Sequence, residues 1–97
     1  MTKPVTIPHF INGATHAPKG ARLGQVFNPA TGQQTGEVVL ASTATVGEAV
    51  AAAKAAFPGW AATPPLRRAR VLNKFLRLLE DRTEELARCI SSEHGKV

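Results

Sequence analysis

The first forty residues carry their apolar side chains in short groups separated by turn-forming residues, a pattern typical of short strands and loops. Residues 9–11 are followed by Asn12-Gly13, and a type I′ turn needs positive φ at both central residues, which Asn-Gly adopts at little cost. We therefore predict a hairpin over residues 9–16, with His9 opposite His16. A second hairpin is predicted from strands at 25–27 and 37–40, joined through residues 28–32.

The apolar spacing then changes from every second residue to every third or fourth, which predicts a helix. Thr45, followed three residues later by Glu48, has the capping-box pattern of a helix start. Pro58-Gly59 predicts the end of this helix, with Trp60 packing just beyond it. The apolar face of the helix comprises Val46, Ala49, Val50, Ala53, Phe57 and, if the helix extends that far, Trp60.

The last third of the chain predicts a second and a third helical segment. Thr63 is the expected cap of the second, because the prolines that follow it fit the first helical turn. Asp81 or Thr83 is the expected cap of the third, and Gly95 is a natural stop. Whether the two segments form one kinked helix stays open. The expected buried stripe of the second segment comprises Leu72, Phe75, Leu76 and Leu79, and Leu86, Ala87 and Ile90 continue the pattern.

A chain of 97 residues supplies at most one modest core. In isolation it is expected to be α+β, with short β-hairpins in residues 1–42 and two or three helices in residues 43–97. A few short strands are too small a surface to cover both the alanine-rich and the leucine-rich helix. We therefore expect part of the core to be missing, and the apolar helix faces to be exposed.

Composition excludes several classes of protein. No apolar run approaches the roughly 20 residues that a membrane span needs, and residues 1–10 lack a signal pattern, so a soluble cytoplasmic protein is expected. A single cysteine excludes an internal disulfide framework and a zinc cluster built from several thiolates. There is also no G-x-G-x-x-G and no G-x-x-x-x-G-K-[ST], hence no recognisable phosphate cradle.

The net charge of +5 raises the alternative of a small basic helical module that binds nucleic acid. Its phosphate-binding stripe would comprise Arg67, Arg70, Lys74 and Arg77, which recur along one side of the second helix. A solvated face is the favoured interpretation, because no stacking aromatics are interleaved and acids downstream can pair with the cations, as Glu84 can with Arg88.

The residues capable of catalysis have simpler explanations. Cys89 is the only strong nucleophile, but it lies late in a helix, at the edge of the expected buried stripe, where a structural thiol is favoured. His9 and His16 face each other across the first hairpin, but no third metal ligand is identifiable, so an incidental solvent-facing pair is favoured. His94 lies near a helix end, where a contact with the helix dipole is expected. We therefore expect no catalytic, cofactor-binding or metal-binding residue in this chain.

Several stretches, taken together, resemble the amino-terminal part of aldehyde dehydrogenases. They are His9-Phe10-Ile11-Asn12-Gly13, Val26-Phe27-Asn28-Pro29-Ala30-Thr31-Gly32, residues 38–41 and residues 49–60. The run from Thr63 to Leu72, with Ser92-Glu93-His94-Gly95-Lys96, is similar to the CoA-acylating methylmalonate-semialdehyde branch. The resemblance runs from about residue 9 to 96 and so covers nearly the whole chain.

The resemblance implies a longer α/β enzyme that has a doubly wound NAD-binding domain, a catalytic domain and an oligomerisation arm. Residues 1–97 would form the amino-terminal part of the NAD-binding domain. In this family a cysteine thiolate attacks the aldehyde and hydride passes to NAD+. In the implied branch, CoA takes the acyl group, CO2 is lost, and the enzymes are homo-oligomers. Cys89 does not match the nucleophile's motif. The chain stops at Val97 where the family continues, which implies a truncated polypeptide, inactive by itself.

Overall fold

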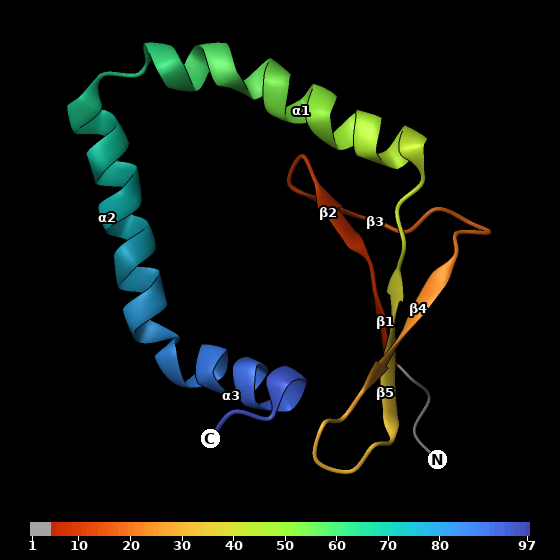
Figure 1. Ribbon diagram of the computed structural model, residues 1–97. Coiled ribbons are helices and arrows are strands. Elements are labelled where there is room, and N and C mark those ends of the chain that lie inside the picture. The colour runs from red at the N-terminus through yellow and green to blue at the C-terminus, as the bar shows by residue number, and fades with distance from the viewer. Residues whose placement is uncertain (1–4) are drawn as a thin grey trace. The chain divides into compact units, whose positions relative to one another are not determined.

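The computed structural model describes residues 5–97, in which five short strands precede three helices (Figure 1). This order agrees with the predicted α+β arrangement. Two compact units can be distinguished, Met1–Ala55 and Ala56–Val97. The elements are β1 (Val5–Ile7), β2 (His9–Ile11), β3 (Ala14–His16), β4 (Leu23–Phe27), β5 (Gln34–Val39), α1 (Thr43–Ala62), α2 (Pro65–Asp81) and α3 (Thr83–His94).

The hairpin predicted at Asn12-Gly13 is present as β2 and β3. The strands pair antiparallel, with His9 opposite His16 and Ile11 opposite Ala14, which is the predicted register. Asn12 has φ of 53° and Gly13 has φ of 76°, so both central residues of the turn are left-handed. The two-residue loop fixes the register because these are the dihedral angles that a type I′ turn requires.

The second predicted hairpin is also present, and it belongs to a three-stranded sheet of order β1-β5-β4. Strand β4 pairs antiparallel with β5, and the turn between them is closed by the Gly32 N–H, which donates to the Asn28 carbonyl at 2.8 Å. Strand β1 pairs parallel with β5, which was not predicted. A strand of three residues whose partner lies thirty residues away leaves no local pattern in the sequence.

The central position of β5 explains why a glycine occupies its middle. A Cβ atom at Gly36 would lie 2.8 Å from the Val5 carbonyl oxygen, closer than real Cβ contacts allow. Any side chain at Gly36 would therefore push β1 away from the sheet.

Ser42, rather than Thr45, caps α1, so the predicted capping box is wrong. The backbone N–H of Thr45 donates to Ser42 Oγ at 3.1 Å, and the two hydroxyl oxygens lie 3.1 Å apart. Thr45 therefore lies at the third helical position, where its side chain is buried, with 6% exposed. Glu48 therefore does not have the capping role that the predicted box gave it. The helix begins three residues earlier than predicted because Ser42 already accepts a hydrogen bond from one of the free N–H groups there, that of Thr45.

Helix α1 continues through Pro58-Gly59 to Ala62, so the predicted end is wrong and Trp60 lies inside the helix. Proline lacks the N–H for one helical bond, but its φ suits a helix, and a helix can continue past it with a kink. Thr63 directly follows the helix, and its hydroxyl donates to the Gly59 carbonyl at 2.8 Å. Thr63 therefore closes α1 and does not cap α2, which starts with Pro65 in its first turn as predicted and has no side-chain cap.

Helices α2 and α3 are separate helices, joined through Arg82. Figure 1 shows the chain changing direction between α2 and α3. Neither Asp81 nor Thr83 caps α3, because the start of α3 has no side-chain cap, and the Thr83 hydroxyl donates backwards, to the Leu79 and Glu80 carbonyls at 3.0 and 2.9 Å. Gly95 ends α3 in the left-handed conformation, as predicted.

Very little of the described chain is buried. Among residues 5–97, Val39, on the central strand, is the one buried large apolar side chain. The stripe expected to be buried on α2 is exposed: 58% for Leu72, 55% for Phe75, 51% for Leu76 and 37% for Leu79. The expectation that the apolar helix faces lack cover is thus confirmed for the described residues. Within that range, no helix is both long and apolar enough to span a membrane.

Candidate functional site

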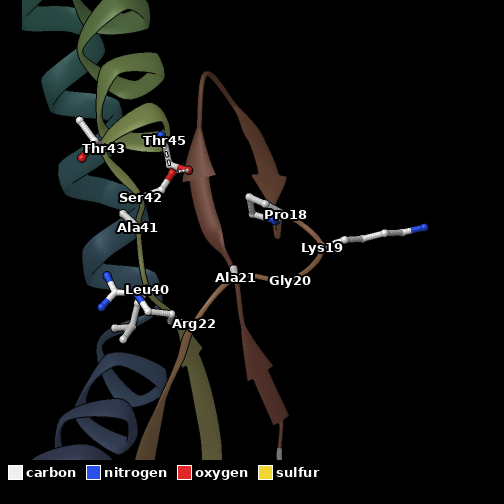
Figure 2. Close-up of a pocket in the computed structure, with 10 residues that line it drawn as sticks. All are labelled: Pro18, Lys19, Gly20, Ala21, Arg22, Leu40, Ala41, Ser42, Thr43 and Thr45. Carbon is white, nitrogen blue, oxygen red and sulfur yellow. Dashed lines mark hydrogen bonds between the residues drawn. The ribbon is translucent and has the colours of Figure 1, made fainter.

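A cavity in the first unit lies between the loop that precedes β4 and the segment that joins β5 to α1. It has a volume of about 510 Å³ and is lined by residues 18–22, residues 40–43 and Thr45 (Figure 2). The two segments are held together by the Leu40 N–H, which donates to the Arg22 carbonyl at 2.9 Å. We call this cavity the loop pocket. The loop pocket is not predicted from the sequence, because it forms only when the two segments meet.

The loop pocket offers hydroxyl groups and cations but no acid–base pair. Ser42 and Thr45 bond to each other, and Figure 2 shows Lys19 pointing away from the other lining residues. Among the described residues, none that lines the cavity carries a carboxylate, imidazole or thiol. Because general acid–base or nucleophilic catalysis needs such groups within hydrogen-bonding reach of one another, the loop pocket does not have the composition of a reaction centre.

His9 and His16 do lie face to face, as the hairpin register predicts, with ring centroids 6.4 Å apart. They are half-buried rather than solvent-facing, and His9 Nε2 is shielded from solvent without a hydrogen-bond partner among residues 5–97. His16 Nε2 lies 3.6 Å from Glu48 Oε2 on α1. Sequence reasoning missed this contact, because Glu48 approaches His16 only when the hairpin packs near the helix.

The imidazole pair does not extend to a metal centre. Within the described part of the chain, no three His, Cys, Asp or Glu side chains are grouped so as to hold a metal ion. A protein site for zinc needs at least three such ligands. The contact between His16 and Glu48 therefore has a structural explanation, since it links the β2–β3 hairpin to the first turns of α1.

The basic side chains of α2 lie on one face, as predicted. Arg70, Asn73, Lys74 and Arg77 line a shallow hollow of about 350 Å³. The pairing of Glu84 with Arg88 is confirmed, with Arg88 Nε donating to Glu84 Oε1 at 3.3 Å. Among residues 5–97 no carboxylate lies within ion-pair distance of the α2 cations, so the expected downstream pairing does not extend to them.

Cys89 is exposed on α3, and its interpretation as a structural thiol stays a prediction. The expected stripe is itself uncovered, so its edge gives no shelter. Activation of a thiol requires a helix amino terminus, a nearby cation or a base, and Cys89 lies in the second half of α3, away from its start. His94 lies in the last turn of α3, as the sequence indicates, and its contact with the helix dipole stays a prediction.

Comparison with known families gives one match that extends over most of the chain. The aldehyde dehydrogenase family matches residues 16–97. This range includes strands β4 and β5 and all three helices, and therefore both compact units contribute to the match.

Curated relatives are similar along almost the whole chain. Malonate-semialdehyde dehydrogenase from Pseudomonas aeruginosa is 47% identical over 92 residues, which are 95% of this chain and 18% of the relative. Malonate-semialdehyde dehydrogenase 2 from Geobacillus thermodenitrificans is 42% identical over 97 residues, which are 100% of this chain and 20% of the relative. The chain thus spans about a fifth of the length of these relatives.

Solved structures share the fold as well as the sequence. A protein provisionally named methylmalonate-semialdehyde dehydrogenase, from Sinorhizobium meliloti 1021 and complexed with NAD, superposes with a TM-score of 0.91 at 49% identity, over 97% of this chain and 19% of its own. Methylmalonate-semialdehyde dehydrogenase from Oceanimonas doudoroffii gives a TM-score of 0.88 at 49% identity, over 93% of this chain and 18% of its own. The alternative of a nucleic-acid-binding module finds no support in these comparisons.

Proposed function

This chain belongs to the aldehyde dehydrogenase family, and we propose that it forms the amino-terminal part of the NAD-binding domain of a CoA-acylating (methyl)malonate-semialdehyde dehydrogenase. Residues 1–42 supply the β-hairpin region and residues 43–97 the helical region of that part. The observation that carries the proposal is the similarity to semialdehyde dehydrogenases at 47% and 49% identity over at least 95% of the chain. The complete enzyme would use the semialdehyde, NAD+ and CoA, and form acyl-CoA, CO2 and NADH.

In this proposal the residues of this chain do not hold NAD. A dinucleotide needs backbone or side-chain donors that converge on its diphosphate. In the loop pocket Ser42 and Thr45 bond to each other and Lys19 points away from the other lining residues, which supports this part of the proposal. The catalytic residues likewise belong to other parts of the enzyme, which is consistent with the exposed position of Cys89.

The role that remains for this chain is structural: its apolar helix faces pack against the rest of the dehydrogenase. The exposed stripe of α2 supports this role, as does a hollow of about 260 Å³ where α2 meets α3. Phe75, Leu79 and Leu86 line the hollow, which has the size and chemistry to receive apolar side chains. Homo-oligomeric assembly and a cytoplasmic location are part of the same proposal. The cytoplasmic location is supported by Cys89, because a free thiol fits a reducing compartment.

The reaction can be tested by adding semialdehyde, NAD+ and CoA to the complete enzyme that carries this sequence, and separately to the 97-residue chain. We expect the complete enzyme to form NADH and acyl-CoA in equal amounts, the former followed by absorbance and the latter by mass spectrometry. The chain alone should form none above a blank. Sustained turnover by the chain alone would refute the structural role, and NADH formation without acyl-CoA would refute the CoA-acylating reaction.

A further inference from the structure

One charged residue of α2 lies within its apolar face. Residues four and seven positions apart lie on the same side of a helix, and Arg68 precedes Leu72 by four and Phe75 by seven. Arg68 is therefore the first member of the apolar stripe of α2. The other cations of the helix, such as Arg67 and Lys74, lie on the opposite, basic side.

Arg68 is also the least exposed residue of its helix. It is half-buried, whereas every other residue of α2 is exposed. Its Nε atom is shielded from solvent and has no hydrogen-bond partner among residues 5–97. A solvated arginine lays its aliphatic stem on apolar surface and keeps its head group in water. The shielded Nε shows that the guanidinium of Arg68 has already lost part of that hydration.

Covering the apolar stripe would remove the remaining water from Arg68. A buried guanidinium is tolerated when an anion pairs with it and its N–H groups find acceptors. A carboxylate meets both needs at once, because its two oxygens match the planar fork of the guanidinium. Within the described residues no carboxylate lies within ion-pair distance of Arg68.

The partner is expected within the same polypeptide, an inference that rests on the proposed function. The matched region makes up 19% of the Sinorhizobium meliloti chain, so most of such an enzyme lies outside the part described here. The stripe of α2 is exposed in the described chain, and a later segment of the enzyme is the surface that would cover it.

We propose that a later segment of the dehydrogenase covers the apolar stripe of α2 and supplies a carboxylate that forms a buried ion pair with Arg68. In this proposal the ion pair of Arg68 sets the position of that segment on α2. It acts by positioning and does not touch the reacting atoms.

The test compares Arg68→Met with Arg67→Met in the complete enzyme by thermal unfolding. Arg67 is the matched control, since it is the adjacent residue but lies on the exposed, basic side. Arg68→Met should lower Tm by roughly 5 °C or more at about pH 8, because it leaves the carboxylate buried without its cation. Losing the cation raises the pKa of that carboxylate in the folded enzyme, so protonation relieves the penalty as pH falls. The loss of Tm should therefore shrink at about pH 5.5, and Arg67→Met should change little at either pH.

Two results would overturn the ion pair. One is an equal Tm for the two methionine variants. The other is a loss at Arg68→Met that stays the same at both pH values, which would indicate a neutral acceptor or simple packing. If Arg68→Met does not fold, Arg68→Lys is compared with Arg67→Lys. The Tm should fall by roughly 2 °C or more in Arg68→Lys and stay unchanged in Arg67→Lys. Equal Tm values of these two lysine variants would overturn the proposal. NADH formation by the unaltered enzyme measures the proposed function separately, so either can fail without the other.

Discussion

The 97-residue chain, purified by itself, will unfold without a cooperative transition and will bind a hydrophobic dye strongly. Cooperative unfolding requires a core that is lost all at once, and Val39 is the one buried large apolar side chain among the described residues. The exposed stripe of α2 gives the dye a surface on which to bind. Helical far-UV circular dichroism should persist while near-UV signals from Trp60 are weak, as in a molten globule.

The measurements for this first prediction are calorimetry and dye fluorescence on a sample whose mass is checked by light scattering. The complete enzyme is the control, and it should show a sharp transition and weak dye fluorescence. A sharp, cooperative transition from a monomer of the isolated chain would contradict the absence of a core.

A charge introduced into the apolar stripe of α2 will strongly destabilise the complete enzyme while changing the isolated chain very little. In the complete enzyme, Leu72→Asp should cost roughly 4 kcal/mol or more, because it removes a buried apolar side chain and buries a charge. In the isolated chain Leu72 is 58% exposed, so the same change should leave far-UV helicity nearly unchanged.

Asn73→Asp is the matched control for Leu72→Asp. It adds the same charge at the next residue, but Asn73 lies beside Lys74 and Arg77 on the basic side of α2. We expect its free energy of unfolding to differ from that of the unaltered enzyme by less than about 0.5 kcal/mol. Denaturant unfolding of both variants decides the matter, and equal stability of Leu72→Asp and Asn73→Asp would show that the stripe stays uncovered in the enzyme.

Local chemistry explains which features of the fold could be predicted from the sequence. The Asn12-Gly13 turn and its register follow from the dihedral angles of two residues, and Gly95 ends α3 for the same reason. The predictions that failed concern competing choices among neighbouring residues. Ser42, and not Thr45, caps α1. Ser42 stands three residues before Thr45 in the sequence, so this alternative cap could have been recognised there. At the other end of α1, Pro58 is compatible with a continuing helix, so it does not mark the helix end.

Contacts between distant segments could not be predicted in the same way. The parallel pairing of β1 with β5, the loop pocket and the approach of Glu48 to His16 all depend on which surfaces meet in three dimensions. Arg68 is an intermediate case. Its place four residues before Leu72 is visible in the sequence, but the shielding of its Nε atom is visible only in the structure.

Hydrogen exchange at the backbone amides of α2 tests the central claim most directly, since protection reports whether a helix is covered and held in a stable fold. The same peptides from Pro65–Asp81 are compared in the complete enzyme and in the isolated chain. If the rest of the dehydrogenase covers the apolar stripe, exchange will be slower in the complete enzyme by roughly a thousandfold or more. Equal exchange rates in the two samples would contradict the account.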